Sequence, residues 1–209
     1  MTCEQEKAVE GKKGLKALEA AAVFILRGKK RGGADVLLAE RQDPQAIEFR
    51  RLSPPGGQFE QGEDSMLCVI REAKEEGELK IKPEDLHQLG PEPLEFKFTL
   101  SEATFLYHPF FAIWSEEMGE PQKKKGEKKG LWQWIGLDQL LKLAGEKKLS
   151  AAVEELIDDL QQAYDYYVAG QLEKKARRSS QRTINVPRLL PESTALPDQK
   201  ANTNSALEL

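Results

Sequence analysis

Apolar runs near the start of the chain predict two neighbouring strands. Residues 20–26 form an almost unbroken apolar segment, and residues 35–40 (Asp-Val-Leu-Leu-Ala-Glu) form a second one. Short continuous apolar runs of this length are typical of buried strands. The basic, glycine-bounded segment 28–33 is a turn, so the two strands are expected to pair as a hairpin.

Alternating apolar and polar positions predict a second strand pair at 94–100 and 103–114, with a bend at Pro109. An aromatic strand is expected at 131–135, and a helix begins at 137–143. Strands and helices therefore share one domain, as in an α/β fold. The aromatic residues of the strand pair are interpreted as core, with a base-stacking ring among them as the alternative; they are Phe96, Phe98, Phe105, Tyr107, Phe110, Phe111 and Trp114.

From residue 150 the apolar positions recur at helical spacing, which predicts an amphipathic helix over 150–176. This helix packs on the domain, or it forms the contact of a homodimer. Arginines and prolines with few apolar residues follow, so 177–209 is expected to be a disordered tail. Residues 1–16 are polar and expected to be flexible, which leaves 17–149 as the main domain. The apolar positions that predict the helix over 150–176 are Val153, Leu156, Ile157, Leu160, Tyr164, Tyr167, Val168 and Leu172.

Residues 57–79, between the two predicted strand pairs, are expected to form a turn and a short helix. Gly57 and Gly62 mark turns, and Asp64 or Ser65 is placed to cap the helix that follows. Small and apolar residues at helical spacing predict the face that packs inward. These residues are Met66, Ile70, Ala73 and Gly77.

Carboxylates gather on another face of this helix. Glu72, Glu75 and Glu76 are spaced i, i+3 and i+4, so their side chains are neighbours. At an effective dielectric constant of about 20, two like charges roughly 4 Å apart repel by about 4 kcal/mol. A bound Mg²⁺ or Mn²⁺ would remove this repulsion, since both ions prefer oxygen ligands. Arg71 is placed to pair with Glu75 or Glu63. The alternative is a solvated helix with scattered charges.

The spacing of these residues resembles the motif of the Nudix hydrolases. In that motif a glycine is followed after five residues by glutamate, and after seven more by Arg-Glu-apolar-x-Glu-Glu-x-Gly-apolar. The chain departs from it at residue 78, where Glu78 replaces the glycine and Gly77 comes one residue early. The matching residues are Gly57, Glu63, Arg71, Glu72, Ala73, Glu75, Glu76 and Leu79.

The resemblance implies a Nudix-like α/β/α sandwich with a mixed β-sheet. It also implies roles for individual residues: Glu72, Glu75, Glu76 and a backbone carbonyl of Gly57 as metal ligands, and Arg71 and Glu63 in support. Arg41 is implied to lie at the edge of the substrate, with an ordinary arginine at a strand end as the alternative. Arg51, just ahead of the glycines, is a second candidate for binding the substrate. Glu127, in a basic loop, is the candidate for an added ligand or general base, with Glu116, Glu117 and Glu120 as rivals.

The activity implied is Mg²⁺- or Mn²⁺-dependent hydrolysis of a nucleoside diphosphate linked to another group, such as ADP-ribose or an NDP-sugar. A metal-bound water attacks one phosphorus, and Glu72 or Glu127 takes its proton. Two other classes stay open. One is a nucleotide-binding module without catalysis, and the other is a scaffold whose C-terminal helix docks a partner.

Composition excludes several kinds of protein but does not indicate the substrate. The chain has 209 residues, a formal net charge of −4 and a pI of about 5.5, which gives no strong case for nucleic acid as a partner. No apolar run is long enough for a membrane span. With two cysteines, a disulfide framework or a zinc site is not expected, and the cytoplasm fits best.

Overall fold

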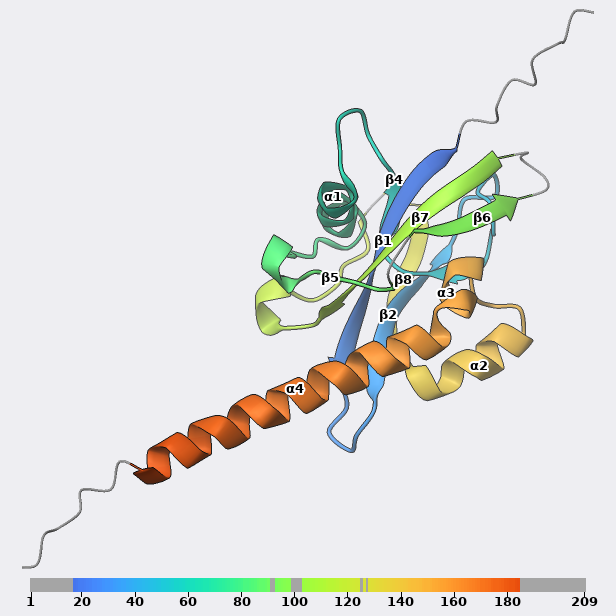
Figure 1. Ribbon diagram of the computed structural model, residues 1–209. Helices are drawn as coiled ribbons and strands as arrows, with labels where there is room; N and C mark the ends of the chain where they lie inside the picture. Colours follow the sequence, from blue (N-terminus) through green and yellow to red (C-terminus); the bar gives the residue numbers. More distant parts are fainter. Residues whose placement is uncertain (1–16, 91–92, 99–102, 125, 127, 185–209) are drawn as a thin grey trace, which may run out of the picture. The chain divides into compact units, whose positions relative to one another are not determined.

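The computed structural model describes residues 17–90, 93–98, 103–124, 126 and 128–184, and its main element is a mixed β-sheet (Figure 1). The strands pair in the order β3-β2-β1-β7-β5, with β4 also on β1, β6 on β7 and β8 on β2. The pairing of β1 with β7 is parallel and the other pairs are antiparallel. The strands are β1 (Leu18–Gly28), β2 (Ala34–Arg41), β3 (Leu52–Ser53), β4 (Gly56–Gln58), β5 (His87–Gln88), β6 (Leu94–Phe98), β7 (Ala103–Ile113) and β8 (Lys129–Gly136).

The expected hairpin of β1 and β2 is confirmed, with Leu26 opposite Val36. Its apolar runs are continuous because both faces of the sheet are covered. The second strand pair is also confirmed, but the bend expected at Pro109 is wrong. Pro109 pairs with Ala22 inside β7, and its carbonyl accepts a hydrogen bond of 2.9 Å from the Leu89 N–H. Proline lacks only the backbone N–H donor, so its carbonyl can still accept a hydrogen bond from the neighbouring segment.

Helices cover the sheet on both faces, which confirms the α/β/α sandwich. On one face α1 (Ser65–Gly77) buries Cys68, Val69 and Ala73 against alternate residues of β1. On the other face α2 (Leu137–Gly145), α3 (Ala151–Glu155) and the start of α4 (Ile157–Ile184) complete a second core. Short 3₁₀ turns lie at Pro83–Asp85 and Glu116–Met118.

The C-terminal helix differs from the expectation in two ways. The single helix expected from residue 150 is interrupted at Leu156, whose side chain is buried in the second core. The helix then continues to Ile184, beyond the expected limit at 176. The chain divides into the units Met1–Ala169 and Gly170–Leu209. The sheet and the glutamates of α1 lie in the first unit.

The expectations for residues 1–16, and for the part of the tail from 185 onward, lie outside the described residues. Within the described chain, no helix combines the length and the apolar content that a membrane span needs.

The start of α1 follows the sequence prediction, and so does its inner face at Ile70, Ala73 and Gly77, but not at Met66. Asp64 caps the helix by accepting a hydrogen bond of 2.8 Å from the Leu67 N–H. The buried side is formed by Cys68, Val69, Ala73 and Gly77, and Met66 is 36% exposed. Met66 precedes Cys68 by two positions, which is more than half a turn of helix. The side chains of Met66 and Cys68 therefore point in nearly opposite directions.

Glu78, the residue that replaces the motif glycine, ends α1 in a left-handed conformation, with φ 56° and ψ 22°. Its N–H bonds to the carbonyls of Ala73 and Lys74, so the helix ends where a glycine at 78 would end it. Gly77 is the last helical residue, and its burial beside Leu79 and Trp132 leaves little room for a side chain.

We expect Glu78→Gly to stabilise the protein by about 0.5–1 kcal/mol, because glycine adopts this conformation without the clash that a Cβ causes. Urea unfolding followed by tryptophan fluorescence measures the change. Glu78→Ala is the matched control, since it removes the charge and keeps the Cβ. If both variants were stabilised equally, the charge and not the backbone would be the cause.

Candidate active site

Strand β4 brings two glycines against the carboxylates of two glutamates. The turn expected at Gly57 is therefore wrong, because Gly56 and Gly57 pair with β1 as part of the sheet, whereas Gly62 does lie in a turn. The carboxylate of Glu72 lies so close to Gly57 that a Cβ there would overlap it. The carboxylate of Glu76 accepts a hydrogen bond of 3.0 Å from the Gly56 N–H. Gly56 itself packs against Ala22 of β1 with no space for a side chain. Glycines are therefore needed at both positions for β1, β4 and the acids to meet.

Lys129 is a buried cation at this site that the sequence interpretation missed. Its side chain is 7% exposed, and its Nζ lies 2.6 Å from the Glu76 carboxylate and 2.5 Å from the Pro54 carbonyl. Burial lowers the pKa of Lys129, and the charge of Glu76 opposes that shift. The run Lys-Lys-Lys-Gly-Glu-Lys-Lys resembles a solvated loop, so only the pairing of its last residue with β2 reveals this one.

Arg71 organises the other carboxylates. Its guanidinium donates to Glu63 at 2.9 Å, to Glu72 at 2.8 Å, to Glu75 at 3.3 Å and to the Gln58 carbonyl at 3.1 Å. Both partners considered for it from the sequence, Glu63 and Glu75, are therefore bound at once. The hydrogen bond from Arg71 lowers the pKa of Glu63.

The chemistry of these residues fits a hard divalent cation. Burial raises the pKa of Glu72 and the charge of Glu76 adds to this effect, although the hydrogen bond from Arg71 opposes it. A bound cation would further stabilise the charged form of this carboxylate. In the described residues, however, no three acidic, histidine or cysteine side chains are already gathered as a metal centre. Glu75 is directed to Arg71, and Glu76 to Lys129. A metal would have to replace part of these contacts.

Of the predicted substrate-binding arginines, only one lies at the pocket beside the two glycines of β4. Arg41 lines this pocket. Arg51 is not among the lining residues: its guanidinium lies 3.3 Å from the Leu149 carbonyl and 3.8 Å from Glu154. Glu127 lies outside the described residues. Of its rivals, Glu116, Glu117 and Glu120 are all exposed, and Glu117 pairs with Lys82 at 2.7 Å.

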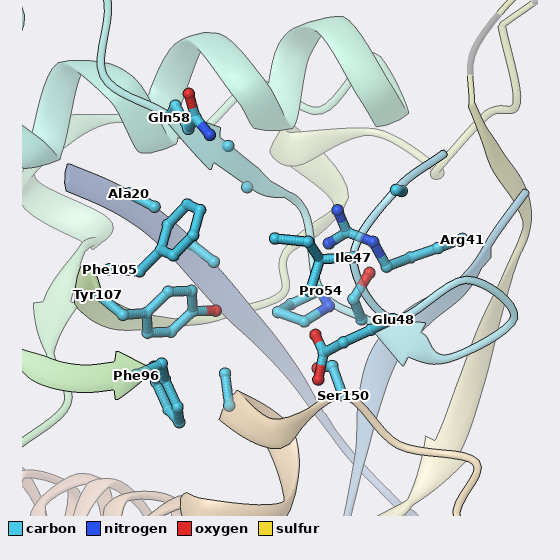
Figure 2. Close-up of a pocket in the computed structure, with 16 residues that line it drawn as sticks. Ala20, Arg41, Ile47, Glu48, Pro54, Gln58, Phe96, Phe105, Tyr107 and Ser150 are labelled. Carbon is cyan, nitrogen blue, oxygen red and sulfur yellow. The ribbon is translucent and has the colours of Figure 1, made fainter. Parts of the chain in front are cut away.

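The pocket has a volume of about 300 Å³ and reaches Gly56 and Gly57 of β4. Figure 2 shows aromatic rings of β6 and β7 along one side of it, and polar side chains on the opposite side. The aromatic side holds Phe96, Phe105 and Tyr107, and the opposite side includes Arg41, Ile47, Glu48 and Ser150.

Solved structures with the same fold cover most of this chain. The C. elegans Ap4A hydrolase, in a binary complex, is 22% identical with a TM-score of 0.51, over 74% of this chain and 99% of that one. The NUDIX domain of Shewanella oneidensis NrtR, complexed with ADP ribose, is 16% identical with a TM-score of 0.56, over 71% and 89%. A NUDIX hydrolase from Nitrosomonas europaea is 19% identical with a TM-score of 0.54, over 71% and 90%.

A search of curated proteins found no match. The sequence model of the NUDIX domain, in contrast, matches residues 16–157, which is more than half of the chain and includes β4, α1 and Lys129. Sequence match, fold and the arrangement of Arg71 with its glutamates agree. The chain therefore belongs to the NUDIX domain family.

Proposed function

We propose that this protein is a Mg²⁺- or Mn²⁺-dependent hydrolase of a nucleoside diphosphate linked to another group, such as ADP-ribose or an NDP-sugar. One observation carries the proposal: the carboxylates of Glu72 and Glu76 and the open pocket meet at the same two glycines, Gly56 and Gly57. A substrate held in the pocket would present its diphosphate at these acids.

The metal would be held by Glu72, Glu75, Glu76 and the Gly57 carbonyl. When bound, it would neutralise charge on the diphosphate oxygens and acidify a water molecule. Arg71 holds Glu72 in place through a contact of 2.8 Å, which keeps the carboxylate turned toward Gly57.

Glu72 is our first choice of general base because its carboxylate lies against Gly57, which also lines the pocket, and Glu127 is the second choice. The water oxygen bonds to one phosphorus, the anhydride bond to the other phosphate breaks, and the carboxylate accepts the proton. The leaving phosphate keeps the bridging oxygen.

A nucleotide-binding module without catalysis is the second candidate, and one contact favours it. Lys129 already provides a positive charge at Glu76, where a metal would bind. Such a protein would use Lys129 in place of the ion and bind the diphosphate without cleaving it.

The test is to incubate the full chain with ADP-ribose, an NDP-sugar and diadenosine tetraphosphate, with Mg²⁺ or with EDTA, in ¹⁸O-enriched water. We expect cleavage of at least one substrate with Mg²⁺, one product phosphate carrying ¹⁸O, and none with EDTA. Mass spectrometry of the separated products reads out both. Binding of these compounds by calorimetry without any metal-dependent cleavage would overturn the proposal and support the binding module.

A further inference from the structure

The aromatic side of the pocket has the chemistry to bind a flat ring. Phe105 and Tyr107 come from β7 and Phe96 from β6, and the Phe96 and Tyr107 rings meet edge to face at 5.8 Å. In Figure 2 the Tyr107 hydroxyl is turned toward the opposite side of the pocket. Aromatic faces stack on planar heterocycles, and each stacked base contributes substantially to binding.

The opposite side carries a carboxylate on a strained loop. Glu48 and Arg50 both have positive φ values, 63° and 65°, which side chains other than glycine seldom adopt. Strain of this kind is held in place where a particular geometry is needed. The Glu48 Oε1 accepts a hydrogen bond from the Ala151 N–H, so the start of α3 fixes the carboxylate in the pocket wall.

Two buried hydroxyl groups of the pocket lack a partner among the described residues. Ser53 and Ser150 are 4% and 3% exposed, and the Oγ atoms of both make no hydrogen bond. Leaving such a group without a partner is unfavourable, so buried hydroxyls are normally hydrogen-bonded. Because both residues line the pocket, an occupant with polar atoms at its edge would supply that partner.

We propose that this pocket is the subsite for the base of the nucleotide, and that it takes a purine with an exocyclic amino group. The ring stacks on the aromatic side, the amino group donates to the Glu48 carboxylate, and ring nitrogens accept from the serine hydroxyls. The volume of about 300 Å³ suits a base and not a whole dinucleotide. The inference rests on the proposed function in one respect, since it assigns the base end of the same substrate.

Binding without metal tests the subsite separately from catalysis. AMP, UMP and ribose 5-phosphate are titrated into the full chain by calorimetry in EDTA. We expect AMP to bind at least about tenfold more tightly than ribose 5-phosphate or UMP. We also expect Glu48→Gln to weaken AMP binding by about tenfold, because the amide still accepts from Ala151 but no longer offers a charged acceptor.

Two further variants complete the experiment. Phe105→Leu keeps an apolar side chain and removes the ring, and is expected to reduce AMP affinity to a similar degree. Glu155→Gln, on the exposed end of α3, is the matched control and should leave it unchanged. Circular dichroism checks that each variant is folded.

Equal binding of ribose 5-phosphate and AMP, or unchanged AMP binding in folded Glu48→Gln, would overturn the base subsite. Metal-dependent hydrolysis could still hold in that case. Conversely, base-selective binding without any hydrolysis would leave the subsite standing and remove the proposed activity.

Discussion

Replacing Lys129 with methionine is expected to destabilise the metal-free protein by about 3–5 kcal/mol, because it leaves a buried carboxylate without its cation. The Nζ of Lys129 lies 2.6 Å from Glu76, and the two side chains are only 7% and 13% exposed. Methionine fills a similar volume, so the loss reports mainly the missing charge and the hydrogen bond to Pro54. Urea unfolding in EDTA, followed by tryptophan fluorescence, measures the free energy.

The neighbouring residue provides the control for this experiment. Lys128 pairs with Asp43 at 2.7 Å, but its side chain is 76% exposed, so Lys128→Met should change the free energy by about 0.5 kcal/mol or less. We also expect Mg²⁺ to raise the melting temperature more in Lys129→Met than in the wild type, because the ion would then meet an uncompensated Glu76. Equal stability of the two variants would show that the ion pair contributes nothing measurable.

Glu76→Gln is expected to lower kcat by on the order of 100-fold or more on the substrate that the cleavage test identifies. Mutation of a residue that only hydrogen-bonds to a metal ligand already lowers activity or metal affinity by about 10–100-fold. Both the Gly56 N–H and Lys129 donate to the same Oε2 atom of Glu76, and the single carbonyl oxygen of glutamine can accept from both, so β4 should keep its place. Initial rates with saturating Mg²⁺ measure the effect, and circular dichroism checks the fold.

A second variant and a control make the result interpretable. Glu72→Gln should cause a loss of the same order, whereas Glu84→Gln, at an exposed turn, should retain wild-type rates. Full activity of folded Glu76→Gln would show that Glu76 is not a metal ligand.

Local patterns predicted the long strands and the helices of this fold because their physical causes are local, but not the short strands β3, β4 and β5, which depend on pairing with β2, β1 and β7. The apolar runs of β1 and β2 report a central sheet position, and the spacing of Glu72, Glu75 and Glu76 reports one side of a helix. The inner face of α1 was less predictable. Met66 and Cys68 are both apolar enough to face inward, and only packing against β1 decides that Cys68 does.

Taken alone, the sequence determined the family, the α/β/α architecture and the acidic face of the helix that follows the two glycines, because spacing along a helix or strand sets the direction of each side chain. Tertiary structure decided what lies opposite those residues. It brought Lys129 from β8 to Glu76, turned Arg51 toward Leu149, and gathered Glu48 and two serines around the same pocket as Tyr107. These partners are far apart in the chain, and their meeting depends on strand pairing and core packing, which no local pattern contains.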